Sequence, residues 1–77
     1  MKKVTIKLST INDIRDFVSQ VTLYDGEVDL SSGRYVVDAK SIMGIFSLDL
    51  MKPIEMTVNS GTNPDDLLSR IEKFIVK

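Results

Sequence analysis

The spacing of apolar residues along this chain changes several times, and this restricts the fold more than any other feature. Residues 4–8 read VTIKL, and their alternation of apolar and polar side chains predicts a half-buried strand. Residues 11–21 instead carry apolar side chains at helical spacing, which is typical of an amphipathic helix. Ser9 or Thr10 can cap the first turn of that helix. The chain therefore begins with a strand followed by a helix.

The next elements are short. Two β-rich runs, residues 27–30 and 34–38, surround a Ser-Ser-Gly turn and predict a hairpin. Residues 40–48 are rich in Met, Ile and Leu and predict a short helix that starts near Ser41. Alternating apolar residues predict a further strand over residues 54–58.

The last helix has the clearest start. Asn63 is expected at its N-cap, Pro64 suits the first helical position, and Asp65 and Asp66 face the positive end of the helix dipole. The predicted order is βαββαβα, with too few residues to cover both faces of a sheet. We therefore expect an α+β fold in which three helices cover one face of a four-stranded antiparallel sheet.

The periodicities also predict which side chains are buried. The expected core contains Val4, Ile6, Ile14, Val18, Ile45, Leu48, Ile54 or Met56, Leu67, Ile71 and Phe74. The opposite face of the sheet is expected to turn Thr5, Lys7, Glu55 and Thr57 toward water.

The composition argues against several classes of protein. The 77 residues include no cysteine and no histidine, so we predict no disulfide, no metal site and no cofactor. Ten basic residues are balanced by 11 acidic ones without charged blocks, which argues against nucleic acid or a membrane surface as a partner. We expect residues 1–77 to form a single cytoplasmic domain.

Residues 40–50, KSIMGIFSLDL, are more apolar than one buried face requires. On a helical wheel, Ile45 and Leu48 form one apolar arc, which suits packing on the sheet. A second arc contains Ile42, Met43, Phe46 and Leu50. This second arc is either an exposed partner surface or part of the core. A further alternative is that the chain unwinds and folds Leu50 and Met51 back.

The run KSIMG at residues 40–44, followed by Ser47-Leu48, resembles the second helix of the HPr family. These are the histidine-containing phosphocarrier proteins of the bacterial phosphotransferase system, and their βαββαβα open-faced β-sandwich is similar to the predicted order. The resemblance implies that Ser41 is a regulatory site phosphorylated by a dedicated kinase. It also implies an apolar protein-docking surface formed by Ile42, Met43, Phe46 and Leu50. Lys40 places a cation beside this surface and completes the predicted protein-binding set.

The sequence departs from the family at the start of the first helix. Family members transfer phosphate through a histidine next to an arginine and a proline, in the loop after the first strand. Here residues 8–17 read LSTINDIRDF, with neither histidine nor proline, and Arg15 lies inside the predicted helix. A phosphate on Thr10 would be a stable ester, and Asp13 is more often a helix cap or a solvated charge than a phosphate carrier. We therefore predict no catalytic residue.

Three hypotheses about function remain. The first is a non-catalytic HPr-like docking module, like a known branch of the family that serves as a phosphorylation-dependent co-effector in carbon catabolite control and the regulation of sugar transport. Its partner would be a transcription regulator or a component of the phosphotransferase system, with an HPr kinase acting on Ser41. The second is a phosphocarrier that uses a residue other than histidine. The third is an accessory or self-associating domain in which Ser41 is only a helix cap.

Overall fold

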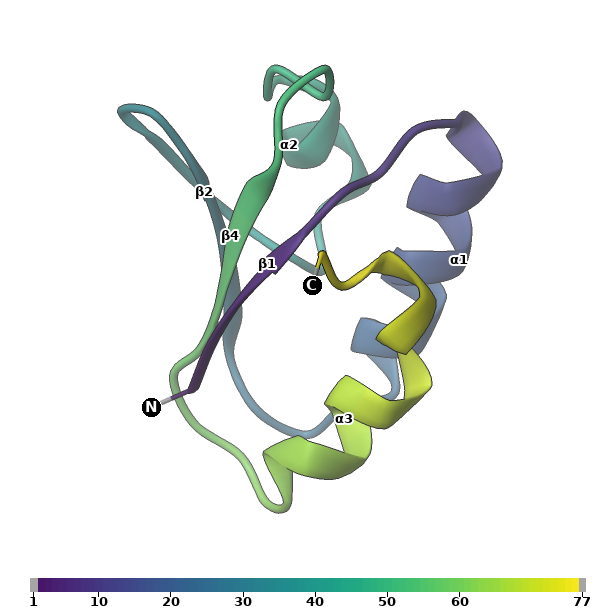
Figure 1. Cartoon of the computed structure of the whole chain (residues 1–77). Helices are drawn as coiled ribbons and strands as arrows, with labels where there is room; N and C mark the ends of the chain where they lie inside the picture. Colours follow the sequence, from purple (N-terminus) through teal and green to yellow (C-terminus); the bar gives the residue numbers. More distant parts are fainter. Residues whose placement is uncertain (1, 77) are drawn as a thin grey trace.

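A computed structural model describes residues 2–76 of the chain (Figure 1). Its elements are β1 (Lys2–Ile6), α1 (Ile11–Thr22), β2 (Val28–Ser32), β3 (Tyr35–Asp38), α2 (Ile42–Phe46), β4 (Ile54–Val58), α3 (Pro64–Arg70) and a 3-10 helix, η1 (Glu72–Phe74). This confirms the predicted order. The last predicted helix is divided into α3 and η1 because Ile71 leaves helical geometry, with φ −109° and ψ 16°.

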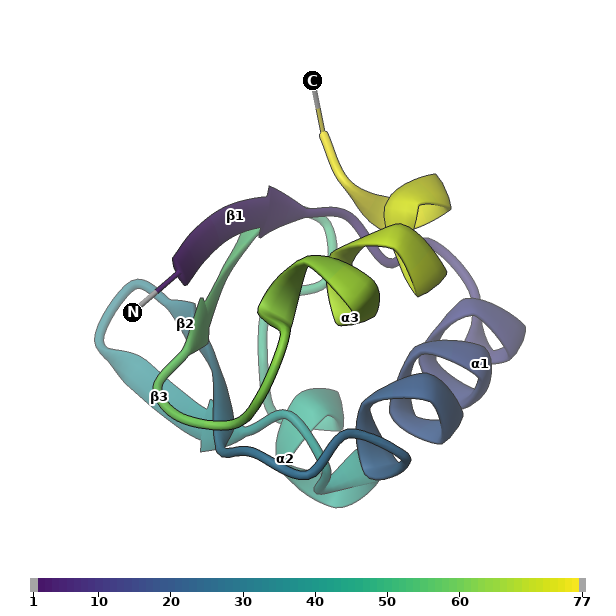
Figure 2. The same ribbon diagram turned by 90° about the horizontal axis from the view of Figure 1, so that it is seen from below.

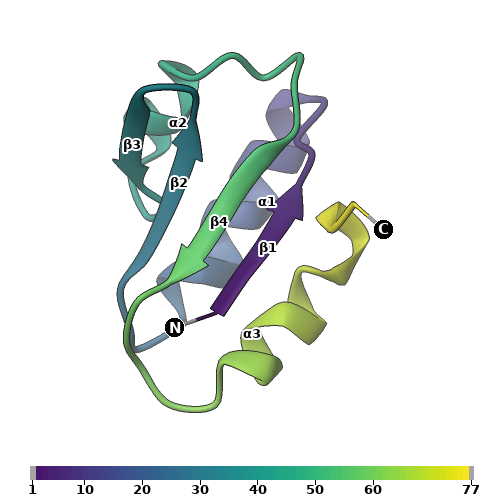
Figure 3. The same cartoon turned by 60° about the vertical axis from the view of Figure 1, so that its left-hand side comes forward.

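The four strands form one antiparallel sheet in the order β1-β4-β2-β3. Figure 2 shows α1, α2 and α3 together on one side of this sheet. The predicted α+β architecture, an open-faced β-sandwich, is therefore confirmed. Strands β1 and β3 form the two edges, and β3 lies at the margin beside β2 in Figure 3.

The predicted hairpin joins β2 to β3. Ser32 lies opposite Tyr35, so Gly33 and Arg34 form a two-residue turn. Gly33 has a φ of 60°, a left-handed conformation that glycine adopts without the steric cost that a side chain would add. The turn thus fixes the register of β3, and with it the position of the chain that enters α2.

The core lies between the sheet and the helices, as predicted. Nine of the predicted residues are buried: Ile6, Ile14, Ile45, Leu48, Ile54, Met56, Leu67, Ile71 and Phe74. Ile54 and Met56 are both buried because alternate residues of β4 share the helix-facing side. Val4 and Val18 are only partly buried and pack at the margin of the core. The rings of Phe17 and Phe74 meet edge to face at 6.1 Å and connect α1 to η1.

The predicted starts of α1 and α3 are correct in position. Thr10 and Asp13 form a capping box at α1, in which each side chain accepts a backbone N–H from the other residue. Asn63 is the N-cap of α3, and Pro64 is its first residue. Asn63 makes no side-chain capping bond, because it uses its tolerance of a left-handed backbone, with φ 48°, to turn the chain into the helix.

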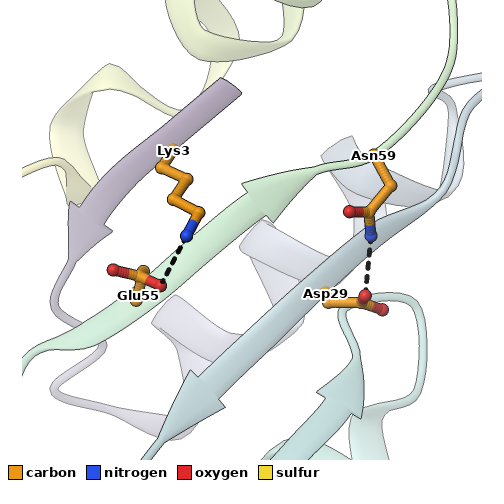
Figure 4. A network of polar contacts seen from close by, with 4 residues as sticks. All are labelled: Lys3, Asp29, Glu55 and Asn59. Atoms are coloured by element: carbon orange, nitrogen blue, oxygen red, sulfur yellow. Dashed lines mark hydrogen bonds and ion pairs between the residues drawn. The ribbon is translucent and has the colours of Figure 1, made fainter. Parts of the chain in front are cut away.

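The outer face of the sheet is polar. Figure 4 shows Lys3 paired with Glu55 at 3.8 Å and the Asn59 amide donating to the Asp29 carboxylate at 2.6 Å. Lys7, which was predicted to face water, is half-buried because its ammonium group donates to the Leu50 carbonyl at 2.9 Å. Apolar docking surfaces therefore have to be sought on the helices or at the edges of the sheet.

Candidate functional site

The candidate site is centred on α2, which contacts both α1 and β3. Gly44 lies inside this helix and permits a close approach to the sheet, because a Cβ atom there would stand 3.2 Å from the Cβ of Val37. The glycine within such an apolar run is thus explained by packing.

The helix is shorter than predicted and ends at Phe46. The N–H groups of Ser47 and Leu48 donate to carbonyls three residues earlier, Gly44 and Ile45, each at 3.0 Å. These bonds tighten the last turn. The Asp49 carboxylate then accepts the N–H of residue 51 at 3.1 Å, which turns the chain away from the helix axis.

The two predicted arcs of α2 differ in burial. Ile45 and Leu48 are buried against the sheet, as predicted, with 0% and 6% exposed. On the second arc, Met43 is 74% exposed and Phe46 is 44% exposed. The helix therefore presents large apolar side chains at the surface of the molecule.

The expectation that all four residues of the second arc are substantially exposed is wrong for two of them. Ile42 and Leu50 are half-buried and pack against the core. α1 and β3 cover more than one side of α2, and Leu50 follows the end of the helix rather than continuing it. The alternative in which the chain unwinds is correct for Leu50 but not for Met51, which is 85% exposed. We call Ile42, Met43, Phe46 and Leu50 the α2 patch.

Ser41 is the exposed N-cap of α2. Its hydroxyl accepts the Gly44 N–H at 3.2 Å, and its own N–H donates to the Asp38 carbonyl at 3.0 Å. The structure thus places the hydroxyl at the surface, directly before the residues of the α2 patch.

Lys40 is half-buried and connects two distant segments. Its ammonium group donates to the Tyr24 carbonyl at 2.9 Å, just after the end of α1, and its N–H donates to the Asp38 carboxylate at 2.8 Å. The charge of Lys40 is thus directed toward the end of α1. Its part in binding a partner stays a prediction.

The polar contacts beside Lys40 were not predicted from the sequence. The Asp25 carboxylate accepts the Thr62 backbone N–H at 3.1 Å and the Thr62 hydroxyl at 2.9 Å. These bonds, with a smaller contribution from the charge of Lys40, hold the pKa of Asp25 below its ordinary value. Burial raises the pKa of Tyr24, and the neighbouring Asp25 carboxylate raises it further. No local sequence pattern joins residues so far apart in the chain.

The start of α1 contains the residues considered for phosphotransfer. The Asp13 carboxylate accepts the N–H groups of Ser9 and Thr10 at 3.0 and 3.3 Å, and the Thr10 hydroxyl accepts the Asp13 N–H at 3.1 Å. Arg15 is exposed on the first turns of α1. The contacts of Thr10 and Asp13 are therefore those of a helix cap.

One surface cleft bears on ligand binding. A cleft of about 610 Å³, which was not predicted from the sequence, lies between the β2–β3 turn and the segment that follows α2. Its lining comprises Ser32, Gly33, Arg34, Tyr35, Ser47, Leu48, Asp49, Lys52 and Pro53.

Within residues 2–76, no group of three or more acidic side chains is placed to hold a metal ion. In the same part of the chain, every helix is too short or too polar to cross a bilayer.

This architecture is similar to that of solved HPr structures. HPr-C-His from Thermoanaerobacter tengcongensis is 21% identical, with a TM-score of 0.79 over 95% of this chain and 89% of that chain. A phosphocarrier protein HPr from Bacillus anthracis str. Ames is 23% identical, with a TM-score of 0.73 over 97% of this chain and 94% of that chain. No protein-family model matches the sequence. The chain therefore has the fold of the HPr phosphocarrier proteins, as the KSIMG run implied.

Proposed function

We propose that this protein is a non-catalytic, HPr-like docking module of the cytoplasm, controlled by phosphorylation of Ser41. The observation that carries the proposal is the exposure of Met43 and Phe46 directly after an exposed serine. Large apolar side chains that gather at the surface of a soluble domain mark a site for a protein partner. The partner is a transcription regulator or a component of the phosphotransferase system, and Ile42, Leu50 and Lys40 form the border of the contact.

Phosphorylation would act on the choice of partner. A phosphate adds about −1.5 to −2 units of charge beside Met43, on a chain whose net charge is −1. A partner that offers only an apolar pocket would be repelled, whereas a pocket with an arginine would bind more tightly. The phosphate would replace a hydroxyl that now accepts one helical N–H, so the start of α2 should keep its cap.

Loss of histidine phosphotransfer is the second half of the proposal. The chain has no histidine, and the Thr10 and Asp13 side chains hold the start of α1. Incubation with phosphoenolpyruvate and the first enzyme of the phosphotransferase system should give no acid-labile phosphate and no acyl phosphate. A stoichiometric gain of one phosphoryl group would instead support the hypothesis of a phosphocarrier that uses another residue.

The switch is tested by mass spectrometry after incubation with an HPr kinase and ATP. One phosphoryl group is expected, on Ser41. Ser47 is the matched control, because it is an exposed serine at the other end of the same helix. Ser41→Ala should abolish the modification, and Ser47→Ala should leave it unchanged. Titration of both forms against candidate partners then measures the effect, and equal binding of the two forms would show that no switch operates.

A further inference from the structure

Strand β3 is an edge of the sheet, and its outer side has no partner strand within residues 2–76. Tyr35 and Val36 are 67% and 64% exposed, although each is a large apolar residue. Figure 3 shows β3 at the margin of the sheet, with α2 behind it rather than beside it. Natural proteins commonly protect such an edge with lysine, proline or a bulge, and residues 35–38, YVVD, contain no lysine or proline.

The backbone of β3 can accept another strand. The Ala39 N–H donates to the Val28 carbonyl at 2.9 Å, and hydrogen-bonded pairs alternate along an antiparallel ladder. Val36 is therefore at a non-hydrogen-bonded position of the β2–β3 ladder, opposite Ser31. Its N–H and C=O groups point away from β2 and toward the open edge.

We propose that β3 pairs antiparallel with β3 of a second copy of this chain, about a two-fold axis at Val36. In that register Val36 lies opposite Val36 of the second copy, and Tyr35 lies opposite Val37 of the second copy. Arg34, which ends the turn, faces Asp38 at the other end of the strand. The sequence RYVVD is thus complementary to itself when reversed, with two aromatic–aliphatic pairs and two oppositely charged pairs.

The charges of the free chain favour this pairing. Asp38 lies opposite Asp29 in the β2–β3 register, and like charges at opposed positions destabilise a sheet. Among residues 2–76, neither Arg34 nor Asp38 takes part in an ion pair. An arginine from a second copy would supply the cation that Asp38 lacks, and Arg34 would gain a carboxylate in return.

The size of the contact sets its strength. β3 has four residues, so the paired edges bury much less surface than a stable dimer interface. We therefore expect a weak, reversible dimer with a dissociation constant on the order of 100 µM. This association uses the sheet edge and is independent of the α2 patch and of Ser41.

Sedimentation equilibrium of the whole chain, from about 10 µM to about 1 mM, tests the proposal. The expected result is a monomer–dimer equilibrium. Val36→Pro should abolish it, because proline removes the outward N–H and leaves the β2–β3 ladder intact. Circular dichroism confirms that the variant is folded. A chain that stays monomeric up to 1 mM, or a dimer that persists in folded Val36→Pro, would overturn the proposal.

Charge exchange gives an independent test that does not depend on the proline variant. Arg34→Asp and Asp38→Arg should each weaken the dimer by about tenfold or more, because each places like charges opposite one another. An equimolar mixture of the two variants should restore it, since the opposed charges then match in both pairs. Arg15→Asp makes the same charge change on the exposed side of α1 and should leave the dimer unchanged. Failure of the mixture to associate would refute the register.

Discussion

Three side chains of α2 give a direct test of how the helix is oriented. Ile45 is fully buried, so Ile45→Ala should lower the free energy of unfolding by about 2–5 kcal/mol. Phe46 is 44% exposed, and full burial of such a side chain contributes about 1.5–3 kcal/mol, so Phe46→Ala should cost about 1–1.5 kcal/mol. Met43 is 74% exposed, and Met43→Ala should cost about 0.5 kcal/mol.

The measurement is chemical denaturation followed by far-ultraviolet circular dichroism. The free energy falls linearly with denaturant, and equal slopes for the three variants would show that the compared states are alike. The predicted ranking is Ile45→Ala first, Phe46→Ala second and Met43→Ala third. A two-state transition in all variants is the condition for comparing the values.

Two results would contradict the assignment of the α2 patch. A loss of about 3–5 kcal/mol for Phe46→Ala would mean that its ring is buried in the core. A loss for Met43→Ala equal to that for Ile45→Ala would mean that the helix is rotated about its axis. If the predicted ranking holds, Met43→Ala becomes the cleanest probe of docking, since it removes an apolar contact and leaves stability nearly unchanged.

Three further predictions concern the rest of the fold. Ile71→Ala should lower the free energy of unfolding by about 2–5 kcal/mol in denaturation, and a loss well under 1 kcal/mol would show that the C-terminal helical segment is misplaced. Asp25→Asn should lower the free energy of unfolding most above pH 3.8, the ordinary pKa of the carboxyl. The difference in free energy from the unmodified protein should disappear as the pH falls through the lower pKa of the folded state. A difference that is constant with pH would contradict this linkage. Gly61→Ala should cost more than about 1 kcal/mol, because φ is 113° and the new Cβ would lie 2.7 Å from the Tyr24 ring. Gly33→Ala, with a positive φ but open space around it, is the matched control and should cost less.

The strands and helices could be predicted because each has a local cause. Alternation in residues 54–58 and helical spacing in residues 11–21 are visible in the sequence, and Thr10 and Pro64 mark helix starts by their own chemistry. The fold class followed from the order of these elements. Ile45 and Leu48 were assigned correctly to the core for the same reason, since the helix that holds Ile45 keeps the expected period.

The rest of the site could not be predicted from the sequence because contacts between distant residues determine it. The helical wheel assumed that α2 continues to Leu50, whereas the chain turns after Phe46 and Lys7 donates to the Leu50 carbonyl from 43 residues away. Lys40 was expected to place a cation beside the docking surface, but its ammonium group donates to a carbonyl 16 residues earlier. Contacts between a long side chain and a distant carbonyl leave no periodic pattern in the sequence.

The small size of α2 has a consequence for anyone who wishes to copy its surface. The helix has five residues, and helices shorter than roughly 12–15 residues are marginal in water on their own. A synthetic peptide of residues 40–50 will therefore not reproduce the patch, which exists only while Gly44 rests on β3. An inhibitor that copies this surface therefore needs a separate folded scaffold to hold the helix in place. A partner that binds only the folded domain will, in turn, raise its free energy of unfolding. Once the site is saturated, this increase grows with the logarithm of the partner's concentration.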